Sequence, residues 1–368
     1  MRRNGGPYPN ERDIRDGFAS CLLVINPSRY PRYSRIFARL ARRIPVPEVI
    51  LTRDREHFVA SVQEFTRSEY RHLLVWGGDG TAHDAINSLA RVPPESMAGK
   101  SVGFLRGGSG NGIQDSYEVP YSIRRQMESY ALSMLNGYEI SVDILRVQDG
   151  PGVEFGQLFG VGFDAKVLAR RDAGKKVRAG MGRYIGSALG EFAAMDFRAL
   201  PAFRLRLEEG KYAFRGTRVN AEFPIDTLDL QTRPVMIELG TRPYYGKLFK
   251  VCPDVVCNDG FMDVYVFEFA DKRSMVLNFG ALWNGHHDKI NKRAARSSRP
   301  VIQRYEVRSL VIQSDSSFSY HVDGELRNAG SAAEGGRIEI SVVPTALKFT
   351  VPPAFYRLFH PFERIEGS

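Results

Sequence analysis

The sequence contains few cysteines, namely Cys21, Cys252 and Cys257, in a chain of 368 residues. An odd number of cysteines, without partners at metal-ligand spacing, argues against both a disulfide framework and a zinc site. Cys21 begins an apolar run and is expected to be a small buried hydrophobic residue. These features favour a reducing, cytoplasmic setting.

Long apolar runs are also missing, since none approaches the roughly 18 residues that a membrane-spanning helix needs. The arginines near the N-terminus are not followed by an apolar segment, so no signal peptide is predicted and residues 1–17 are expected to form a loose tail. The hydrophobic fraction of 43% and the charged fraction of 25% are typical of a soluble globular protein. A chain of 368 residues exceeds the usual size of one core and predicts two domains.

The chain is basic, with a formal net charge of +9. The positive charges gather around residues 35–43, 170–183 and 289–304. Such clusters suit nucleic acid, nucleotide phosphates or an anionic membrane surface, and the alternative is a set of solvated faces that aid solubility. Because no zinc-finger, RNP-type or helix-turn-helix pattern accompanies them, no nucleic-acid partner is expected.

One glycine-rich stretch organises the first half of the chain. The apolar run 72–76 predicts a buried strand, and it breaks abruptly into Gly77-Gly78-Asp79-Gly80-Thr81 before a segment with helical spacing. Glycines let an anion approach the backbone, and a helix N-terminus presents N–H groups that suit phosphate. The alternative is a tight strand-to-helix turn in which Asp79 merely caps the helix.

A second glycine-rich turn, Arg106–Gly112, follows another predicted strand at 101–105. Two such turns at adjacent strand ends can cradle one polyphosphate, with Ser109 and Asn111 adding hydrogen bonds; an ordinary flexible loop is the alternative. Further strands at 21–25 and 49–52 alternate with helical patterns at 35–44 and 57–68. This alternation predicts an α/β domain with a parallel sheet, whose ligands bind at the carboxyl ends of the strands.

The second half of the chain has a different pattern, with strand-like segments separated by long polar stretches and a helical pattern around 184–195. It predicts a β-rich domain, most simply a sandwich, after a boundary near 138–146. The predicted strands cover 140–147, 155–162, 203–207, 235–239, 262–269 and 310–312.

Taken in order, these segments resemble the lipid-kinase family that includes diacylglycerol kinases, sphingosine kinases and bacterial lipid kinases. A lone Gly-Gly-Asp-Gly is weak evidence, whereas the ordered series is specific. The segments that carry the resemblance are Asn26-Pro27, Gly77–Thr81, Gly108–Asn111, Phe159–Asp164, Met181–Tyr184, Cys252–Asp254, Asn258–Asp263 and Val322–Glu325.

The resemblance implies an ATP-binding α/β domain at 18–142, a β-sandwich for the lipid substrate at 143–340, and an active site in the cleft between them. It also implies that a C-terminal segment, 341–368, packs back on the first domain. That segment carries an aromatic, amphipathic stretch at 347–365, for which shallow membrane contact is the alternative.

The resemblance also assigns nucleotide-binding roles, with ATP and Mg²⁺ as cofactors. Asp84 is a candidate for the ribose or a simple helix-start charge, and Arg171 and Arg183 are candidates for the β- and γ-phosphates or for surface ion pairs. The other residues expected to hold the nucleotide are Asn26, Thr52, Gly77, Gly78, Gly80, Thr81, Gly108, Ser109, Gly110, Asn111 and Gly324.

Acidic residues are the candidates for the chemistry. Asp79 and Glu325 can accept the proton of the lipid hydroxyl, with Asp79 preferred, while Asp323 or Glu325 organises Mg²⁺. The resemblance gives Asp164 a contact with the polar head of the acceptor. It gives Asp259 a structural Mg²⁺ site, for which an Asp-Gly hairpin turn is the alternative.

The function expected from these features is an ATP-dependent lipid kinase that is cytoplasmic and peripherally bound to an anionic membrane. Arg106 and Gly112 stand where diacylglycerol-directed bacterial members often carry Pro and an acidic residue, so diacylglycerol, a sphingoid base and ceramide all stay open as acceptors. One alternative is a kinase of a soluble substrate such as NAD, which is disfavoured because no NAD-kinase-like Asn-Glu segment follows the second glycine-rich turn. The other alternative is a non-enzymatic nucleotide or membrane sensor. The oligomeric state, a homodimer included, also stays open.

Overall fold

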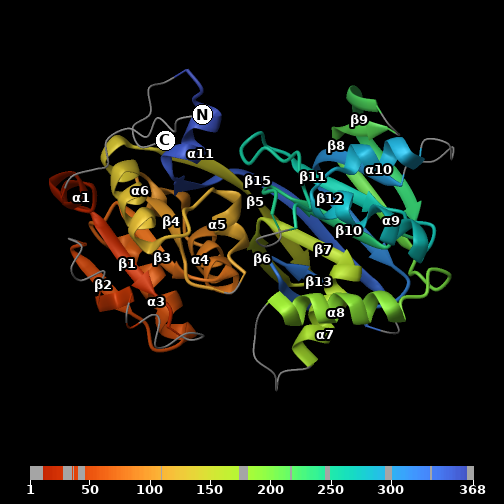
Figure 1. Cartoon of the computed structure of the whole chain (residues 1–368), viewed down its shortest axis with the longest axis horizontal. Coiled ribbons are helices and arrows are strands. Elements are labelled where there is room, and N and C mark those ends of the chain that lie inside the picture. Colours follow the sequence, from red (N-terminus) through yellow and green to blue (C-terminus); the bar gives the residue numbers. More distant parts are fainter. Residues whose placement is uncertain are drawn as a thin grey trace. The chain divides into compact units, whose positions relative to one another are not determined.

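The computed structural model describes residues 11–27, 35, 37–39, 46–108, 110–173, 181–215, 218–244, 249–294, 301–331 and 334–362. The chain forms two compact units (Figure 1). Unit 1 contains Met1–Val142 together with Thr345–Ser368, and unit 2 contains Asp143–Pro344.

Unit 1 is built on a parallel sheet in the order β4-β3-β1-β2. Its strands end at the same edge, because Ile25 is in register with both Leu51 and Trp76, and Gly77 is in register with Arg106. The strands are β1 (Cys21–Ile25), β2 (Glu48–Leu51), β3 (His72–Gly77) and β4 (Ser101–Arg106). Every residue of β1, β3 and β4 is buried, as expected of a parallel sheet that is covered on both faces.

Helices connect these strands, and α3 shows how the local sequence forms one of them. In α3 (Arg55–Arg67), Phe58, Val62 and Phe65 share one buried face, and the side chain of Asp54 caps the helix by accepting the N–H of His57 at 2.7 Å. The other described helices of unit 1 are α1 (Glu11–Gly17), α4 (Asp79–Ala90), η1 (Pro94–Met97), α5 (Gly112–Ser116), α6 (Ile123–Asn136) and α11 (Pro353–Phe359). Most of the helix predicted at 35–44 lies outside the described residues.

Of the C-terminal segment predicted at 341–368, residues 345–368 belong to unit 1. The strand β15 (Gly336–Thr350) extends into this unit, where Phe349 pairs with Val102 of β4. The ring of Phe349 packs against Phe104 and Tyr117, with centroids 5.2 and 5.1 Å apart. Within the aromatic stretch noted at 347–365, Phe349 and Phe355 are buried in this unit, while Phe362 is exposed.

Unit 2 is built on antiparallel strands in the order β14-β13-β7-β10-β11-β12, and β12 pairs further with β15 and β8. The predicted fold class, an α/β part with a parallel sheet and a β-rich part, is confirmed. The strands are β5 (Glu139–Asp149), β6 (Gly152–Gly156), β7 (Leu158–Gly162), β8 (Phe203–Arg215), β9 (Arg218–Thr232), β10 (Met236–Gly240), β11 (Met262–Phe267), β12 (Ile302–Ser314), β13 (Phe318–Val322) and β14 (Glu325–Ala329).

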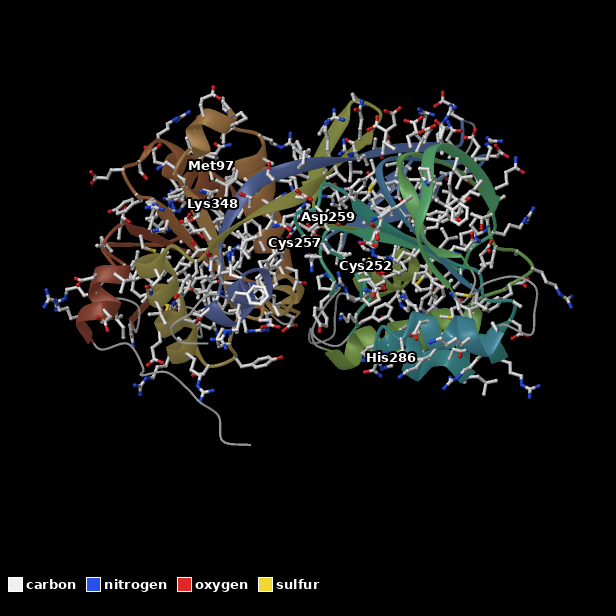
Figure 2. The ribbon with its side chains drawn as sticks, turned by 90° about the horizontal axis from the view of Figure 1, so that it is seen from above. Met97, Cys252, Cys257, Asp259, His286 and Lys348 are labelled. Carbon is white, nitrogen blue, oxygen red and sulfur yellow. The ribbon has the colours of Figure 1, made fainter. Side chains whose placement is uncertain are left out.

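Alternate residues of these strands enter two different cores. Ile237 and Leu239 of β10 join an all-strand core, whereas Met236 of the same strand joins a core with Met275 and Ile290 from the helices. One face of the sheet is thus covered by helices: α7 (Phe163–Ala173), α8 (Met181–Ala194), α9 (Lys272–Trp283) and α10 (His287–Ala294). All three cysteines are buried, and Figure 2 labels Cys252 and Cys257.

The single strand predicted over 155–162 is wrong, because the chain changes partners in its middle. β6 pairs with β5, whereas β7 pairs with β10 and β13. Between them the buried backbone N–H of Gln157 donates to the carboxylate of Asp323, at 3.2 Å, instead of to a neighbouring strand. A side chain from a distant hairpin interrupts this strand, which local sequence does not reveal.

His287 makes the stability of the protein depend on pH. Its ring is 1% exposed and packs edge-on against Tyr265 and Phe267. Burial, with a contribution from the charge of Arg304, lowers the pKa of His287 to about 3. In the unfolded chain the imidazole of His287 binds a proton near pH 6.5, whereas in the folded chain it stays neutral at that pH. The free energy of unfolding therefore falls as the pH drops below about 6.5.

We expect His287→Phe to remove this part of the acid sensitivity. By linkage, the parent loses about 2 kcal/mol of unfolding free energy at this one site between neutral pH and about pH 5. Urea unfolding at both pH values measures the difference. His286→Gln changes an exposed neighbour and serves as the control. An unchanged pH dependence in His287→Phe would contradict the assignment.

Candidate functional site

The two glycine-rich turns touch through their backbones at the carboxyl edge of the unit 1 sheet. The N–H of Gly107 donates to the carbonyl of Gly77 at 2.8 Å. A Cβ added to Gly108 would lie 2.3 Å from the Cα of Gly78, and one added to Gly78 would lie 2.9 Å from the Cα of Gly108. Neither turn has room for a side chain here, so these glycines are required by the contact itself.

The N-terminus of α4 opens directly onto this edge. The strand β3 ends at Gly77, and Gly78 is the N-cap of α4, so no cap side chain occupies the N–H groups of the first turn. Asn26, which follows β1, donates through Nδ2 to the hydroxyl of Thr81 at 3.1 Å. Uncapped N–H groups and the positive end of the helix dipole suit an anion at this point.

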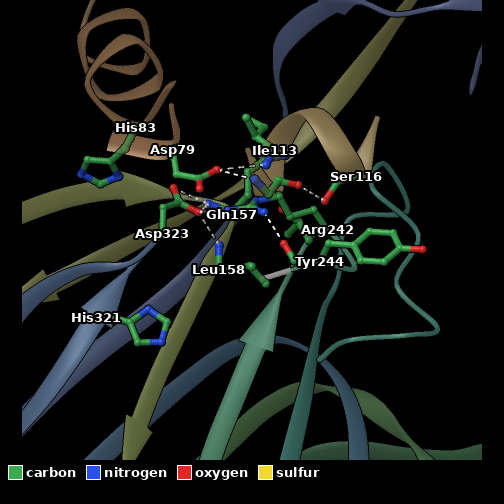
Figure 3. Close-up of polar contacts among 12 residues, drawn as sticks. Asp79, His83, Ile113, Ser116, Gln157, Leu158, Arg242, Tyr244, His321 and Asp323 are labelled. Atoms are coloured by element: carbon green, nitrogen blue, oxygen red, sulfur yellow. Dashed lines mark hydrogen bonds and ion pairs between the residues drawn. The ribbon is translucent and has the colours of Figure 1, made fainter. Parts of the chain in front are cut away.

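Asp79 caps the next helix rather than its own. Its Oδ1 accepts the N–H of Gly112 at 2.5 Å and of Ile113 at 3.3 Å, both in the first turn of α5 (Figure 3). A Cβ on Gly110 would lie 2.3 Å from Oδ2 of the same carboxylate. Asp79 therefore connects the second glycine turn to the first. The sequence predicted it as a general base or as a cap of its own helix, and neither prediction included this role.

Two side-chain amides hold the second turn in shape. Asn111 has φ 63°, its Oδ1 accepts the N–H of Gly108 at 2.9 Å, and its Nδ2 donates to the carbonyl of Gly108 at 2.9 Å. Gln114, which sequence reasoning missed, donates from its buried Nε2 to the carbonyls of Gly77 and Leu105 at 3.3 and 3.2 Å. Ser109 lies outside the described residues.

Thr52 and Asp84, two further residues expected to hold the nucleotide, make internal contacts. The hydroxyl of Thr52 is buried and donates to the carbonyl of Ile25 at 3.1 Å, beside the ends of β1 and β2. Asp84, on α4, forms a bidentate ion pair with Arg55 at 2.6 and 2.9 Å. Unit 1 thus brings Thr52 to the same strand edge as the glycine turns, while Asp84 is paired with the start of α3.

Asp323 and Gly324, from the motif Val322–Glu325 that carries part of the family resemblance, form a two-residue turn between β13 and β14. Asp323 and Gly324 have φ values of 50° and 91°, as a type I′ turn requires. The buried carboxylate of Asp323 accepts the N–H groups of Gln157 and Leu158 and the guanidinium of Arg242, the last two at 3.0 Å (Figure 3). Glu325, the first residue of β14, is exposed.

The sequence did not reveal Arg242, because its partner lies 81 positions further along the chain. A second donor of Arg242, Nη1, donates to the carbonyl of Tyr244. Asp323 and Arg242 are both almost fully buried, so the pair stabilises the hairpin only while both charges are present.

Asp164 lies in a buried polar cluster on the helix-covered face of unit 2. Its Oδ2 is 2.8 Å from Nε2 of His321, and Oε2 of Glu238 is 3.8 Å from the same nitrogen. Burial, and then the charge of Asp164, raise the pKa of Glu238 well above its usual range. Glu238 lies outside the segments that carry the family resemblance, so only the fold shows that it belongs to this buried cluster.

Asp259 lies in the predicted turn (Figure 2). Its Oδ1 accepts the N–H of Phe261 at 3.1 Å, and the N–H of Gly260 donates to the buried carboxylate of Asp143 at 2.7 Å. Burial raises the pKa of Asp259, and the charges of Glu306 and Asp143 raise it further. Two neighbouring carboxylates can hold a hard cation such as Mg²⁺, and the hydrogen bonds alone also account for an Asp-Gly turn.

Arg171 and Arg183 lie on neighbouring helices of unit 2. Arg171 is half-buried in the last turn of α7. Arg183 is in the first turn of α8, and its side chain is outside what the structure describes. Their expected contacts with phosphates therefore stay predictions.

Comparison with known proteins covers most of the chain. Residues 22–147 match the diacylglycerol kinase catalytic domain, and residues 158–351 match the YegS C-terminal NAD kinase beta sandwich-like domain. A diacylglycerol kinase of Mycobacterium tuberculosis H37Rv is 23% identical over 282 residues, which cover 76% of each chain. A Pseudomonas aeruginosa PAO1 protein named "Probable lipid kinase YegS-like" is 22% identical over 291 residues, 79% of this chain and 80% of its own.

Solved structures show the same fold. A crystal structure from Bacillus anthracis superimposes with a TM-score of 0.63 at 18% identity, covering 96% of this chain and 99% of its own. A diacylglycerol kinase structure from the same strain gives a TM-score of 0.58 at 15% identity, covering 91% and 98%. The chain therefore belongs to the lipid-kinase family in which a diacylglycerol kinase catalytic domain precedes a YegS-type β-sandwich domain.

Proposed function

We infer that this protein is an ATP- and Mg²⁺-dependent kinase that phosphorylates a hydroxyl group of a membrane lipid. The observation that carries the proposal is the uncapped N-terminus of α4 beside two touching glycine turns. Phosphoryl transfer depends on positioning the phosphates and neutralising their charge, and this edge of the sheet offers backbone N–H groups for both tasks.

Within unit 1, the anion site is assigned to α4 rather than α5. The first-turn N–H groups of α5 are already bonded to Asp79, whereas the N-cap of α4 is a glycine. Asn26 and Thr81, joined by a hydrogen bond, border the same turn and are proposed to contact the nucleotide there. Mg²⁺ would supply charge neutralisation at the phosphates when bound with ATP.

We assign the general base to Glu325 and a positioning role to Asp79. The Oδ1 atom of Asp79 already accepts two backbone N–H groups of α5, so this carboxylate is engaged in holding the second glycine turn. Glu325 is exposed at the start of β14, so its carboxylate is accessible to a substrate, as a general base must be. Asp323, held by Arg242, then fixes the hairpin that carries Glu325.

Access to a lipid in a bilayer requires a membrane-facing surface, and α9 and α10 offer one. Val276, Leu277 and Phe279 of α9 are 58%, 68% and 55% exposed. Among described residues, the exposed cations Arg273, Lys289, Lys292 and Arg293 lie on the same two helices, which fits an anionic bilayer. The described part of the chain contains no helix that is long and apolar enough to cross a bilayer.

We expect the double substitution Val276→Glu, Leu277→Glu to weaken binding to anionic vesicles by about tenfold or more, because it removes two apolar anchors and adds negative charge. Co-sedimentation with phosphatidylglycerol vesicles measures the effect. Leu135→Glu, at an exposed leucine of α6, is the control and should bind like the parent. Equal binding by the parent and the double variant would place the membrane contact elsewhere.

The activity itself is tested with γ-labelled ATP and Mg²⁺ on vesicles that carry diacylglycerol, sphingosine or ceramide. Labelled lipid in one of these reactions supports the proposal and identifies the acceptor class. A parallel reaction contains NAD in place of vesicles, and a labelled product there, with no labelled lipid in the others, would instead identify a kinase of a soluble substrate. ATP binding without any labelled product would favour a sensor.

A further inference from the structure

Three neighbouring strands of unit 2 place Glu238, Gly160 and His321 in one row. Glu238 of β10 and His321 of β13 are both in register with Gly160 of β7, which lies between them. Their neighbours along the strands, such as Leu239, Val161 and Tyr320, enter the all-strand core. Because side chains alternate along a strand, this row points to the other face, which is covered by helices.

The glycine in the middle of the row lets the outer two side chains meet. A Cβ on Gly160 would lie 2.3 Å from Nε2 of His321 and 2.6 Å from each carboxylate oxygen of Glu238. Both side chains therefore lean over Gly160 into the space that any other residue would fill.

A third ligand-type atom comes from the helix that covers this row. The strand β7 ends at Gly162 and α7 begins at Phe163, so Asp164 is carried directly back over the sheet. Its Oδ2 is 2.8 Å from Nε2 of His321. One potential ligand atom from each of Asp164, Glu238 and His321 lies within 4.8 Å of the others.

The carboxylate of Glu238 is an independent observation that points to a ligand at this cluster. Glu238 is completely buried, yet neither oxygen accepts a hydrogen bond from any residue that the structure describes. Buried polar groups are normally hydrogen-bonded, and buried charges are normally paired or coordinate a metal. Both oxygens face the imidazole nitrogen across Gly160.

We propose that Asp164, Glu238 and His321 bind one divalent transition-metal ion of the zinc or manganese class, which joins α7 to the row of strands beneath it. Two carboxylates balance the charge of a divalent ion, and an imidazole nitrogen selects a transition metal over Mg²⁺ or Ca²⁺. Together, His321 Nε2, one oxygen of Asp164 and both oxygens of Glu238 supply four donor atoms, as in a closed structural site. All three residues belong to unit 2, on α7, β10 and β13.

The test is elemental analysis of the full-length protein after extensive dialysis against metal-free buffer. We expect about one equivalent of zinc or manganese per chain, and a lower thermal midpoint after removal by a strong chelator that zinc or manganese alone restores. Cobalt substitution adds a spectroscopic readout, because ligand-field bands appear only when Co²⁺ is coordinated.

Glu238→Gln keeps the shape of the side chain and removes one charge, so it should retain well under half an equivalent of metal and lose the chelator response. Glu339→Gln, at an exposed ion pair with Arg337, is the matched control and should retain the metal. The proposal is overturned if the parent protein binds none of these ions and its thermal midpoint changes neither with chelator nor with added metal. In that case protons and the His321–Asp164 pair alone hold the cluster together.

Discussion

Gly108→Ala is expected to lower kinase activity by about 100-fold or more, through weaker and misplaced nucleotide binding. The added methyl group would lie 2.3 Å from the Cα of Gly78, and the obstacle is backbone that has no side chain to move aside. The two turns must separate, and this shift occurs at the point where the phosphates of ATP are proposed to bind. Isothermal titration with ATP and a kinetic assay measure the two components.

The control for this experiment is Gly186→Ala. Gly186 lies in α8, and a Cβ there would meet nothing within 4 Å, so the substitution should keep full activity and gain about 0.5–1 kcal/mol of stability. A Gly108→Ala protein that binds ATP as tightly as the parent would show that the touching turns do not form the phosphate site.

Glu325→Gln is expected to lower kcat by a factor of about 10² to 10⁴, the usual range for loss of a general base. Glu325 is exposed, and Gln has the same shape, so folding and ATP binding should remain unchanged. Steady-state kinetics with a lipid acceptor, together with a direct measurement of ATP affinity, separates these effects. Glu334→Gln, at another exposed glutamate of unit 2, is the control.

Asp79→Asn distinguishes the two candidate bases. The amide oxygen of Asn can still accept the N–H groups of Gly112 and Ile113, but without the charge that strengthens those bonds. We therefore expect a higher KM for ATP and a smaller loss of kcat than in Glu325→Gln. The reverse pattern, with kcat abolished in Asp79→Asn and nearly intact in Glu325→Gln, would return the role of base to Asp79.

The sequence predicted the elements whose signals are local. Continuous apolar runs marked β1, β3 and β4, because strands of a covered parallel sheet are apolar on both faces. The glycine turns were visible because glycine tolerates a close backbone approach that other residues do not.

Contacts between distant segments were not predictable in the same way. Asp79 was read as a base or as a cap for its own helix, and only the fold shows that it caps α5, 33 positions further along. Arg242 and Gln157 meet Asp323 across long stretches of chain, so no spacing rule could find them. The partner change at Gln157 is invisible for the same reason.

Sequence alone established the order of motifs, and with it the family, since each motif depends on residues that are adjacent in the chain. Tertiary structure decided which carboxylates accept backbone N–H groups, as Asp79 and Asp323 do, and which are exposed to solvent, as Glu325 is. The row Glu238–Gly160–His321 shows why: strand pairing sets which side chains share a face, and pairing partners are chosen by the fold as a whole. A single glycine then determines whether the two neighbouring side chains meet.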